Sequence, residues 1–102
     1  MVKIKKIVQF GFKFIDPMKL KGVPVLDCRV IKNPYSKFLS EDAQKEIVRN
    51  NPLFNEVVEV GVRLLSEHDK IFIGCLFGKH RSGAVSEEIA KRTGAIIELM
   101  RY

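Results

Sequence analysis

The fold of this chain is decided by the sequence KIFIGCLFGKHRS, which occupies residues 70–82. The apolar run 70–75 predicts a buried strand, and the residues from Ser82 to Arg92 predict a helix. The segment 74–82 therefore leads from a strand into a helix N-terminus. Such a junction favours anions, because loop amides and the first helix N–H groups point at one place. The segment also carries Lys, His, Arg and Ser side chains, so chemistry with phosphate is the leading hypothesis.

Outward from this segment, the chain predicts an α/β fold of the order β-β-α-α-β-loop-α-β. The predicted elements are strands at 2–12, 23–30, 70–75 and 95–100, and helices at 40–50, 54–65 and 82–92. Ser40 is a typical N-cap, and Gly94 is a typical helix C-cap. The alternation along the first strand predicts that its phenylalanines belong to the core; they are Phe10, Phe12 and Phe14.

We expect residues 1–102 to form a single domain with a mostly parallel four-stranded sheet flanked by helices. The run 70–75 is apolar on both faces, which is typical of a central strand. In sheets of this kind ligands bind beyond the carboxyl ends of the strands. The loop that follows Cys75 lies at that position.

Composition limits the function classes. The chain has 102 residues, 46% of them hydrophobic, which is enough for one small core. No apolar run is long enough to span a membrane and the N-terminus lacks a signal-peptide core, so we expect a cytoplasmic protein without a membrane partner. Two cysteines and two histidines give little material for a metal site. We therefore expect neither a metal nor a cofactor.

The net charge of +6 is concentrated near the N-terminus. Residues 1–22 contain six lysines and one acidic residue, Asp16. A basic edge attracts polyanions such as RNA, and the candidates for RNA contact are Lys3, Lys5, Lys6 and Lys13. The alternative is a solvated edge on which lysines protect an exposed strand, and charge alone favours this alternative.

Three hypotheses compete for the 74–82 segment. A nucleotide P-loop is disfavoured, because the spacing from Gly74 to Gly78 is one residue too short and His80 stands where Ser or Thr binds magnesium. The pattern C-x5-R-S resembles the protein tyrosine phosphatase signature, with Cys75 as nucleophile and Arg81 as a bidentate phosphate clamp. The third hypothesis is a phosphate site without turnover, in which Cys75 is a small buried residue.

The phosphatase hypothesis has two weaknesses in the sequence. Gly74 precedes the cysteine, where that family usually has His. No clear general-acid loop is visible either, and the candidates for that role are Asp16 and Asp27. If the chain were an enzyme, it would be a cysteine-dependent phosphomonoesterase.

A longer resemblance favours the binding hypothesis. In chain order, the chain contains FGFK at 10–13, LDCRV at 26–30, NPY at 33–35, GC at 74–75 and GKHRS at 78–82. Glu87 and Glu88 follow in the last helix. This ordered set, spread over residues 7–92, resembles the C-terminal domain of the RapZ family of RNase adapter proteins.

The resemblance implies a non-catalytic sensor or adapter that binds glucosamine 6-phosphate, an amino-sugar phosphate, and also binds small RNA. It implies a phosphate site formed by Cys75, Gly78, Lys79, His80, Arg81 and Ser82. It implies a cleft lined by Leu76, Phe77, Asp27, Arg29, Asn33 and Tyr35. A structural alternative for the strand charges is a local network between Asp27 and Arg29. We also expect a homo-oligomer.

The chain departs from the family pattern at three points. Leu76-Phe77 replaces the usual Thr-Gly, which changes the wall of the sugar pocket. The family usually has an N-terminal P-loop domain and a basic C-terminal tail, whereas this sequence ends at Tyr102. The departures concern the sugar identity and the RNA contact rather than the phosphate site.

Overall fold

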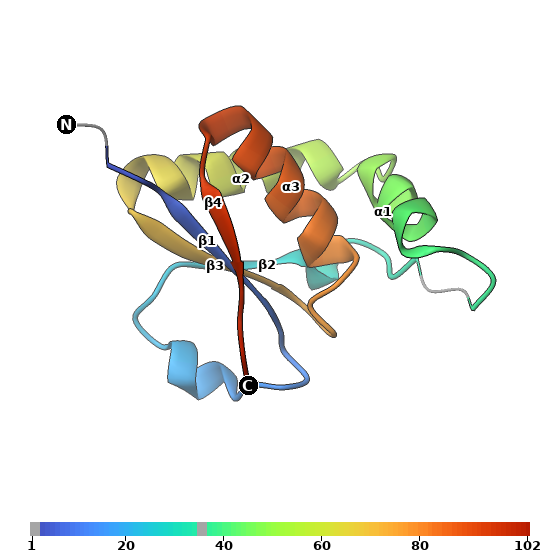
Figure 1. Cartoon of the computed structure of the whole chain (residues 1–102), viewed down its shortest axis with the longest axis horizontal. Coiled ribbons are helices and arrows are strands. Elements are labelled where there is room, and N and C mark those ends of the chain that lie inside the picture. Colours follow the sequence, from blue (N-terminus) through green and yellow to red (C-terminus); the bar gives the residue numbers. More distant parts are fainter. Residues whose placement is uncertain (1–2, 35–36) are drawn as a thin grey trace.

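Residues 70–75 form β3 (Lys70–Cys75), which lies inside the sheet as predicted (Figure 1). The computed structural model describes residues 3–34 and 37–102, and within them the sheet has four strands in the order β2-β3-β1-β4. The other strands are β1 (Lys6–Gly11), β2 (Val25–Asp27) and β4 (Ile96–Leu99). Adjacent strands run parallel, which confirms the predicted fold class.

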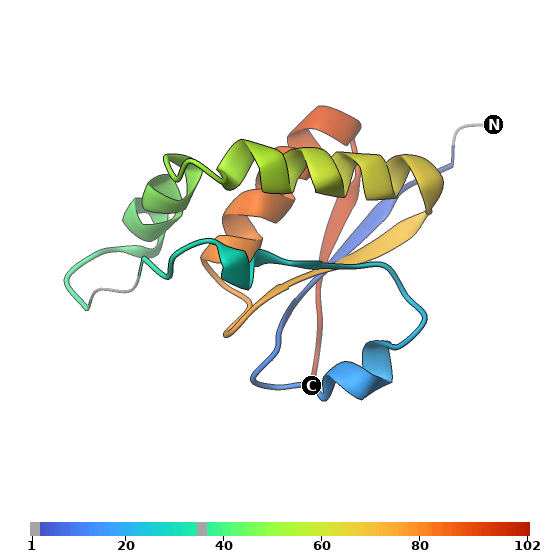
Figure 2. The same cartoon turned by 180° about the vertical axis from the view of Figure 1, so that it is seen from behind.

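Three α-helices of the described chain cover one face of the sheet (Figure 1, Figure 2). They are α1 (Glu41–Arg49), α2 (Phe54–Glu67) and α3 (Arg81–Thr93). Alternate strand residues such as Ile7, Ile71 and Ile73 are buried in one cluster with apolar residues of these helices. The short 3-10 helix η1 (Pro17–Leu20) lies on the opposite side of the sheet. None of the helices in residues 3–34 and 37–102 is long and apolar enough to span a membrane.

The opposite face of the sheet is packed by aromatic residues. Phe10 is 1% exposed, and its ring contacts those of Phe12 and Phe72 at centroid distances of 4.7 and 6.2 Å. Gly74 makes room for it, because a Cβ there would lie 2.5 Å from the Phe10 ring. The prediction of a core position is confirmed for Phe10 but is wrong for Phe14, which is 51% exposed.

The second strand is shorter than its sequence predicts. We expected residues 23–30, but β2 ends at Asp27 and the 3-10 helix η2 (Cys28–Val30) follows. The cause is local: the Asp27 carboxylate accepts a hydrogen bond of 2.9 Å from the backbone N–H of Arg29 and turns the chain. Similarly, Asp16 caps η1 where we expected only a turn.

The predicted helix ends agree closely with the structure. Ser40 Oγ accepts from the backbone N–H of Ala43 at 3.1 Å and so caps α1. Gly94 ends α3 in the left-handed conformation, with φ of 77°. The first strand runs from Lys6 to Gly11, so the predicted range 2–12 is too long at both ends; residues 3–5 lie outside the strand, and position 2 lies outside the described residues.

Candidate anion-binding site

The β3–α3 loop, residues 76–80, lies at the carboxyl end of β3 and beside the end of β1. The carbonyl oxygens of Cys75 and Leu76 accept hydrogen bonds of 2.9 Å from the backbone N–H groups of Phe12 and Lys13. The carbonyl of Gly78 accepts a bond of 2.7 Å from Nε2 of Gln9. These carbonyl oxygens are therefore turned towards β1 and away from solvent.

The amides of the same segment have no such partners. Across the part of the chain that the structure describes, the backbone N–H groups of residues 77–83 donate no hydrogen bond to a protein atom. The first helical bond of α3 runs from Ala84 N to His80 O, and no side chain caps this helix. A run of free N–H groups at a helix N-terminus is a typical anion site. The predicted geometry is thus present in the backbone itself.

Two glycines permit the loop to lie against β1. Gly78 has a φ of 77°, and a Cβ there would lie 2.6 Å from the backbone of Phe10. A Cβ at Gly11 would lie 2.6 Å from the backbone of Phe77. Side chains at either position would push the loop away from β1 and turn its amides.

Arg81 is 8% exposed and belongs to the first turn of α3. Its Nη1 donates to the carbonyl oxygens of Ile31 at 3.1 Å and of Arg29 at 3.4 Å, so it joins α3 to η2. All its hydrogen bonds to described residues come from Nη1, which leaves Nε and Nη2 for a ligand. Arg81 could instead have paired with Glu41, Glu87 or Glu88, but no ion pair of Arg81 occurs among the described residues, and Glu87 pairs with Lys45 and Arg49 while Glu88 pairs with Arg92.

Cys75 and Ser82 are both buried below the loop. The Cys75 thiol donates to Ser82 Oγ at a Sγ–Oγ distance of 3.3 Å. Ser82 is fully buried, so its side chain faces the core rather than the loop opening. Cys28 lies in the same core cluster. The pKa of its thiol is raised far above the ordinary value, mainly because the thiol is buried and also because Cys75 and Asp27 lie near it.

His80 and Lys79 lie at the loop surface. Burial lowers the pKa of His80, and the neighbouring Lys79 and Lys45 lower it further, while Glu41 acts in the opposite direction. His80 is therefore a neutral imidazole near pH 7. Its Nε2 is buried and has no hydrogen-bond partner within the described residues. Lys79 is exposed and supplies a positive charge at the same place.

Within the described part of the chain, three cavities have lining residues in the loop. One of them, of about 460 Å³, is lined by Gly78 and Lys79 but also by Glu41 and Glu87, whose carboxylates disfavour an anion. The other two share four lining residues. The inner one has a volume of about 20 Å³ and is lined by Asn33, Cys75, Phe77, Lys79, His80 and Arg81. The outer groove has a volume of about 540 Å³ and is lined by Phe14, Asn33, Phe77, Lys79 and His80. The inner cavity is the size of a water molecule, so a bound phosphate would lie at its mouth, with any attached group in the outer groove.

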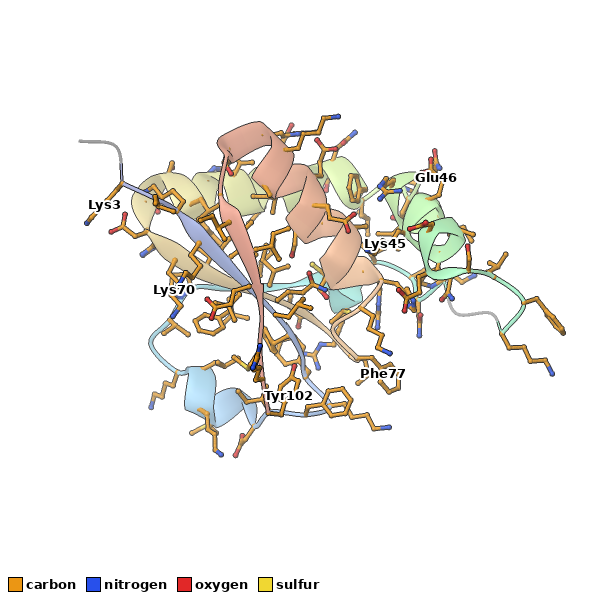
Figure 3. The ribbon with its side chains drawn as sticks, viewed as in Figure 1. Lys3, Lys45, Glu46, Lys70, Phe77 and Tyr102 are labelled. Carbon is orange, nitrogen blue, oxygen red and sulfur yellow. The ribbon has the colours of Figure 1, made fainter. Side chains whose placement is uncertain are left out.

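A hollow of about 800 Å³ lies elsewhere, on the face of the sheet without α-helices. Its lining residues are Val8, Lys70, Phe72, Glu98, Leu99, Met100 and Arg101. Figure 3 shows Lys70 far from Phe77, which marks the loop end of the sheet. This hollow is not at a helix N-terminus and its lining includes the carboxylate of Glu98, so the cavities by the loop are the better anion site.

The remaining predicted cleft residues are Asp27, Arg29, Leu76 and Tyr35, and the first two bind each other. Asp27 and Arg29 form a two-bond ion pair, with Nη2–Oδ2 at 2.7 Å and Nε–Oδ1 at 2.9 Å. Burial opposes the charge of Asp27, but the hydrogen bonds from Arg29 outweigh it and hold the pKa of Asp27 below its ordinary value. Leu76 is partly exposed on the loop. Tyr35 lies outside the described residues.

The candidate RNA-binding lysines are paired. Lys3 and Lys5 contact Asp69 at 2.7 and 3.2 Å, and Lys6 contacts Glu98 at 3.1 Å. Lys13 Nζ lies over the ring of Phe77, 4.8 Å from its centroid. These lysines do not form one cluster of free cations. Among the described residues there is also no group of three or more His, Cys, Asp or Glu side chains that could hold a metal.

Sequence reasoning missed Gln9 and the groove residue Phe14. Gln9 is 9% exposed and lies on the helix-covered face of the sheet together with Ile7. The alternation of apolar residues at positions 8, 10, 12 and 14 places position 9 on the polar face, so no signal in the sequence indicates that Gln9 is buried. Phe14 gave no such signal, because it continues the apolar alternation of β1 past the end of the strand.

The relatives found by comparison with known proteins share the name nucleotide-binding protein. No family model matches the chain, and no solved structure matches it. A nucleotide-binding protein of Pediococcus pentosaceus is 30% identical over 84% of the chain, and one of Rubrobacter xylanophilus is 32% identical over 87%. A third, from Kocuria rhizophila, is 34% identical over 84%. The chain spans about a third of the length of these curated relatives.

Proposed function

We propose that this chain is a non-catalytic binding domain for a phosphorylated small molecule, which it holds at the β3–α3 loop. The observation that carries the proposal is the one-sided hydrogen bonding of the loop. The carbonyl oxygens of Cys75, Leu76 and Gly78 accept hydrogen bonds from β1 and the two residues that follow it, whereas the N–H groups of residues 77–83 have no acceptor among the described residues. Lys79 and the free Nε and Nη2 of Arg81 add positive charge at the same place.

The relatives support a phosphorylated ligand, since they are named nucleotide-binding proteins. A match to a third of their length is consistent with a separate domain such as the C-terminal domain of the RapZ family. We propose that residues 1–102 are a domain of that kind and act as a sensor or adapter. On the basis of the resemblance, glucosamine 6-phosphate is the first ligand to test. We also propose, on the same basis, that the domain binds RNA and forms a homo-oligomer.

Hydrolysis of the phosphate is less well supported. Cys75 is 3% exposed, and its thiol already donates to Ser82. The two acids considered as proton donors are engaged: Asp27 is ion-paired with Arg29, and Asp16 caps η1. A carboxylate whose pKa is lowered by an arginine is a poor general acid. None of the described residues that line the inner cavity is acidic.

A phosphorus NMR spectrum of glucosamine 6-phosphate, followed for hours with the protein, tests this proposal. We expect the ligand line to broaden or shift without the appearance of inorganic phosphate, and we expect the same with Cys75→Ser. Release of inorganic phosphate that depends on Cys75 would establish a phosphatase instead. A sharp, unshifted line for glucosamine 6-phosphate and for inorganic phosphate alike would refute the binding site.

A further inference from the structure

The outer groove beside the loop is aromatic. Phe14 is 51% exposed and Phe77 is 45% exposed, and exposed apolar side chains that lie together are a feature of ligand-binding grooves. Their ring centroids lie 6.3 Å apart with planes tilted by 58°. Both rings line the groove of about 540 Å³, a volume that accommodates a small organic molecule. The groove continues from the loop that carries the free amides, because Lys79 and His80 line both cavities.

These rings are held in place by neighbours from two other parts of the chain. The ring of Tyr102 packs on Phe14 at a centroid distance of 5.2 Å, and its hydroxyl accepts a bond of 2.6 Å from the backbone N–H of Gly11. Lys13 lies over Phe77. Tyr102, Phe14 and Phe77 therefore form a contiguous set of aromatic rings. Figure 3 shows Phe77 and Tyr102 at the same end of the molecule.

The charges around the groove select against a cationic ligand. Of the described residues that line the two cavities, none is acidic, and Lys79 and Arg81 are basic. The lowered pKa of His80 keeps this side chain neutral near pH 7. The ammonium group of an amino sugar in this groove would therefore face Lys79 and would find no carboxylate among the described residues that line the groove. A neutral, planar ring would instead gain contact with Phe14 and Phe77.

The geometry points to a nucleoside 5′-monophosphate as the ligand, with its phosphate on the amides of residues 77–83 and its base packed against Phe14 and Phe77. This inference rests on the proposed function, because it uses the same phosphate position. It differs from the resemblance in the organic part of the ligand, which is an aromatic base rather than an amino sugar. Stacking of a base on aromatic side chains contributes enough to change the affinity about tenfold or more.

Calorimetric titration at constant ionic strength tests the inference with four ligands: AMP, ribose 5-phosphate, glucosamine 6-phosphate and adenosine. We expect AMP to bind at least about tenfold more tightly than ribose 5-phosphate. Glucosamine 6-phosphate should bind most weakly of the three phosphates, and adenosine should bind far more weakly than AMP.

Three other outcomes are informative. Equal affinities for AMP and ribose 5-phosphate would refute the base contact but would still support the phosphate site. If no phosphate ester binds, the proposed function itself fails. If adenosine binds as well as AMP, the groove is not a continuation of a phosphate site, and the inference is wrong.

Two variants locate the base. Phe77→Leu and Phe14→Leu should each weaken AMP binding severalfold and leave ribose 5-phosphate unchanged. Phe38→Leu is the matched control, because Phe38 is 85% exposed and does not line either cavity. Loss of AMP affinity in the control as well, or retention in both groove variants, would contradict the placement. Measurement of both ligands on each variant separates a lost base contact from a misfolded protein.

Discussion

The side-chain amide of Gln9 donates a hydrogen bond of 2.7 Å to the backbone carbonyl of Gly78. This bond joins the middle of β1 to the loop that precedes α3. It fixes the peptide plane between Gly78 and Lys79, so that the carbonyl oxygen is turned inward and the N–H group points the other way. A buried glutamine in the sheet thus positions the anion loop.

Replacement of Gln9 by Leu should weaken phosphate binding about tenfold, which corresponds to about 1.4 kcal/mol, and should lower the free energy of unfolding by about 1 kcal/mol. The reason is that the Gly78 carbonyl loses its partner and the loop its orientation. Gln44→Leu is the matched control, because Gln44 is equally buried and donates to the carbonyl of Leu39, away from the loop. Urea unfolding and phosphate titration check the pair. Equal binding by the two variants would contradict the positioning role of Gln9.

Gly78→Ala should abolish phosphate binding and destabilise the fold, whereas Gly22→Ala should affect stability only. Both glycines have positive φ, of 77° and 88°, so both substitutions introduce backbone strain of about 1 kcal/mol. Only the Cβ at Gly78 would also meet the backbone of β1, since the space around Gly22 is open. Thermal unfolding should therefore show a lower Tm for Gly78→Ala than for Gly22→Ala. Similar Tm values with intact phosphate binding in both would show that the close approach to β1 is unimportant.

Arg81→Met should lower the free energy of unfolding by about 1–3 kcal/mol, because the carbonyl oxygens of Ile31 and Arg29 lose a charged donor in a buried place. It should also weaken phosphate binding. Arg92→Met, which removes a half-exposed arginine paired with Glu88, should change stability by less than about 0.5 kcal/mol. Denaturant unfolding of the two variants provides the comparison. If Arg81→Met were as stable as the wild type, the link between α3 and η2 would contribute nothing.

The stability of the ligand-free protein should depend on pH through His80. Its pKa is lower in the folded than in the unfolded state, mainly because of burial, so the unfolded state binds the proton more readily. The free energy of unfolding should therefore fall as the pH decreases from about 6.5, the ordinary histidine value, towards the folded pKa, and His80→Gln should remove that part of the slope. The lowered pKa values of Asp27 and Asp69 affect stability only at more acidic pH, below the ordinary aspartate value of 3.8. An NMR titration in which the His80 ring has a pKa above 6.5 would contradict this prediction.

The strand, loop and last helix could be predicted because their signals are local. The apolar run before Cys75, the donors up to Ser82 and the C-cap at Gly94 are contiguous in sequence, and the structure keeps them together. The same holds for the Ser40 cap of α1. These features depend on hydrogen bonds and burial within a few residues, which a single sequence records.

Other features depend on contacts between distant segments. The order β2-β3-β1-β4 places β1 between β3 and β4, and no local pattern encodes that order. The hydrogen bond from Arg81 Nη1 to the carbonyl of Ile31, 50 residues earlier in the chain, could not be read from the sequence, and the prediction that Arg81 binds the phosphate stays a prediction. Phe14 was expected in the core, but β1 ends at Gly11 and the chain then turns outward into the groove.

The most direct test of the central claim is a ¹H–¹⁵N spectrum of the protein titrated with inorganic phosphate at constant ionic strength. We predict that the largest shifts fall on the amides of residues 77–83, because these N–H groups are the free donors that the anion would occupy. The amides of β4 and of the paired lysines near Asp69 should shift little. Absence of saturable shifts at residues 77–83, or shifts centred on the hollow around Lys70 and Phe72, would contradict the account.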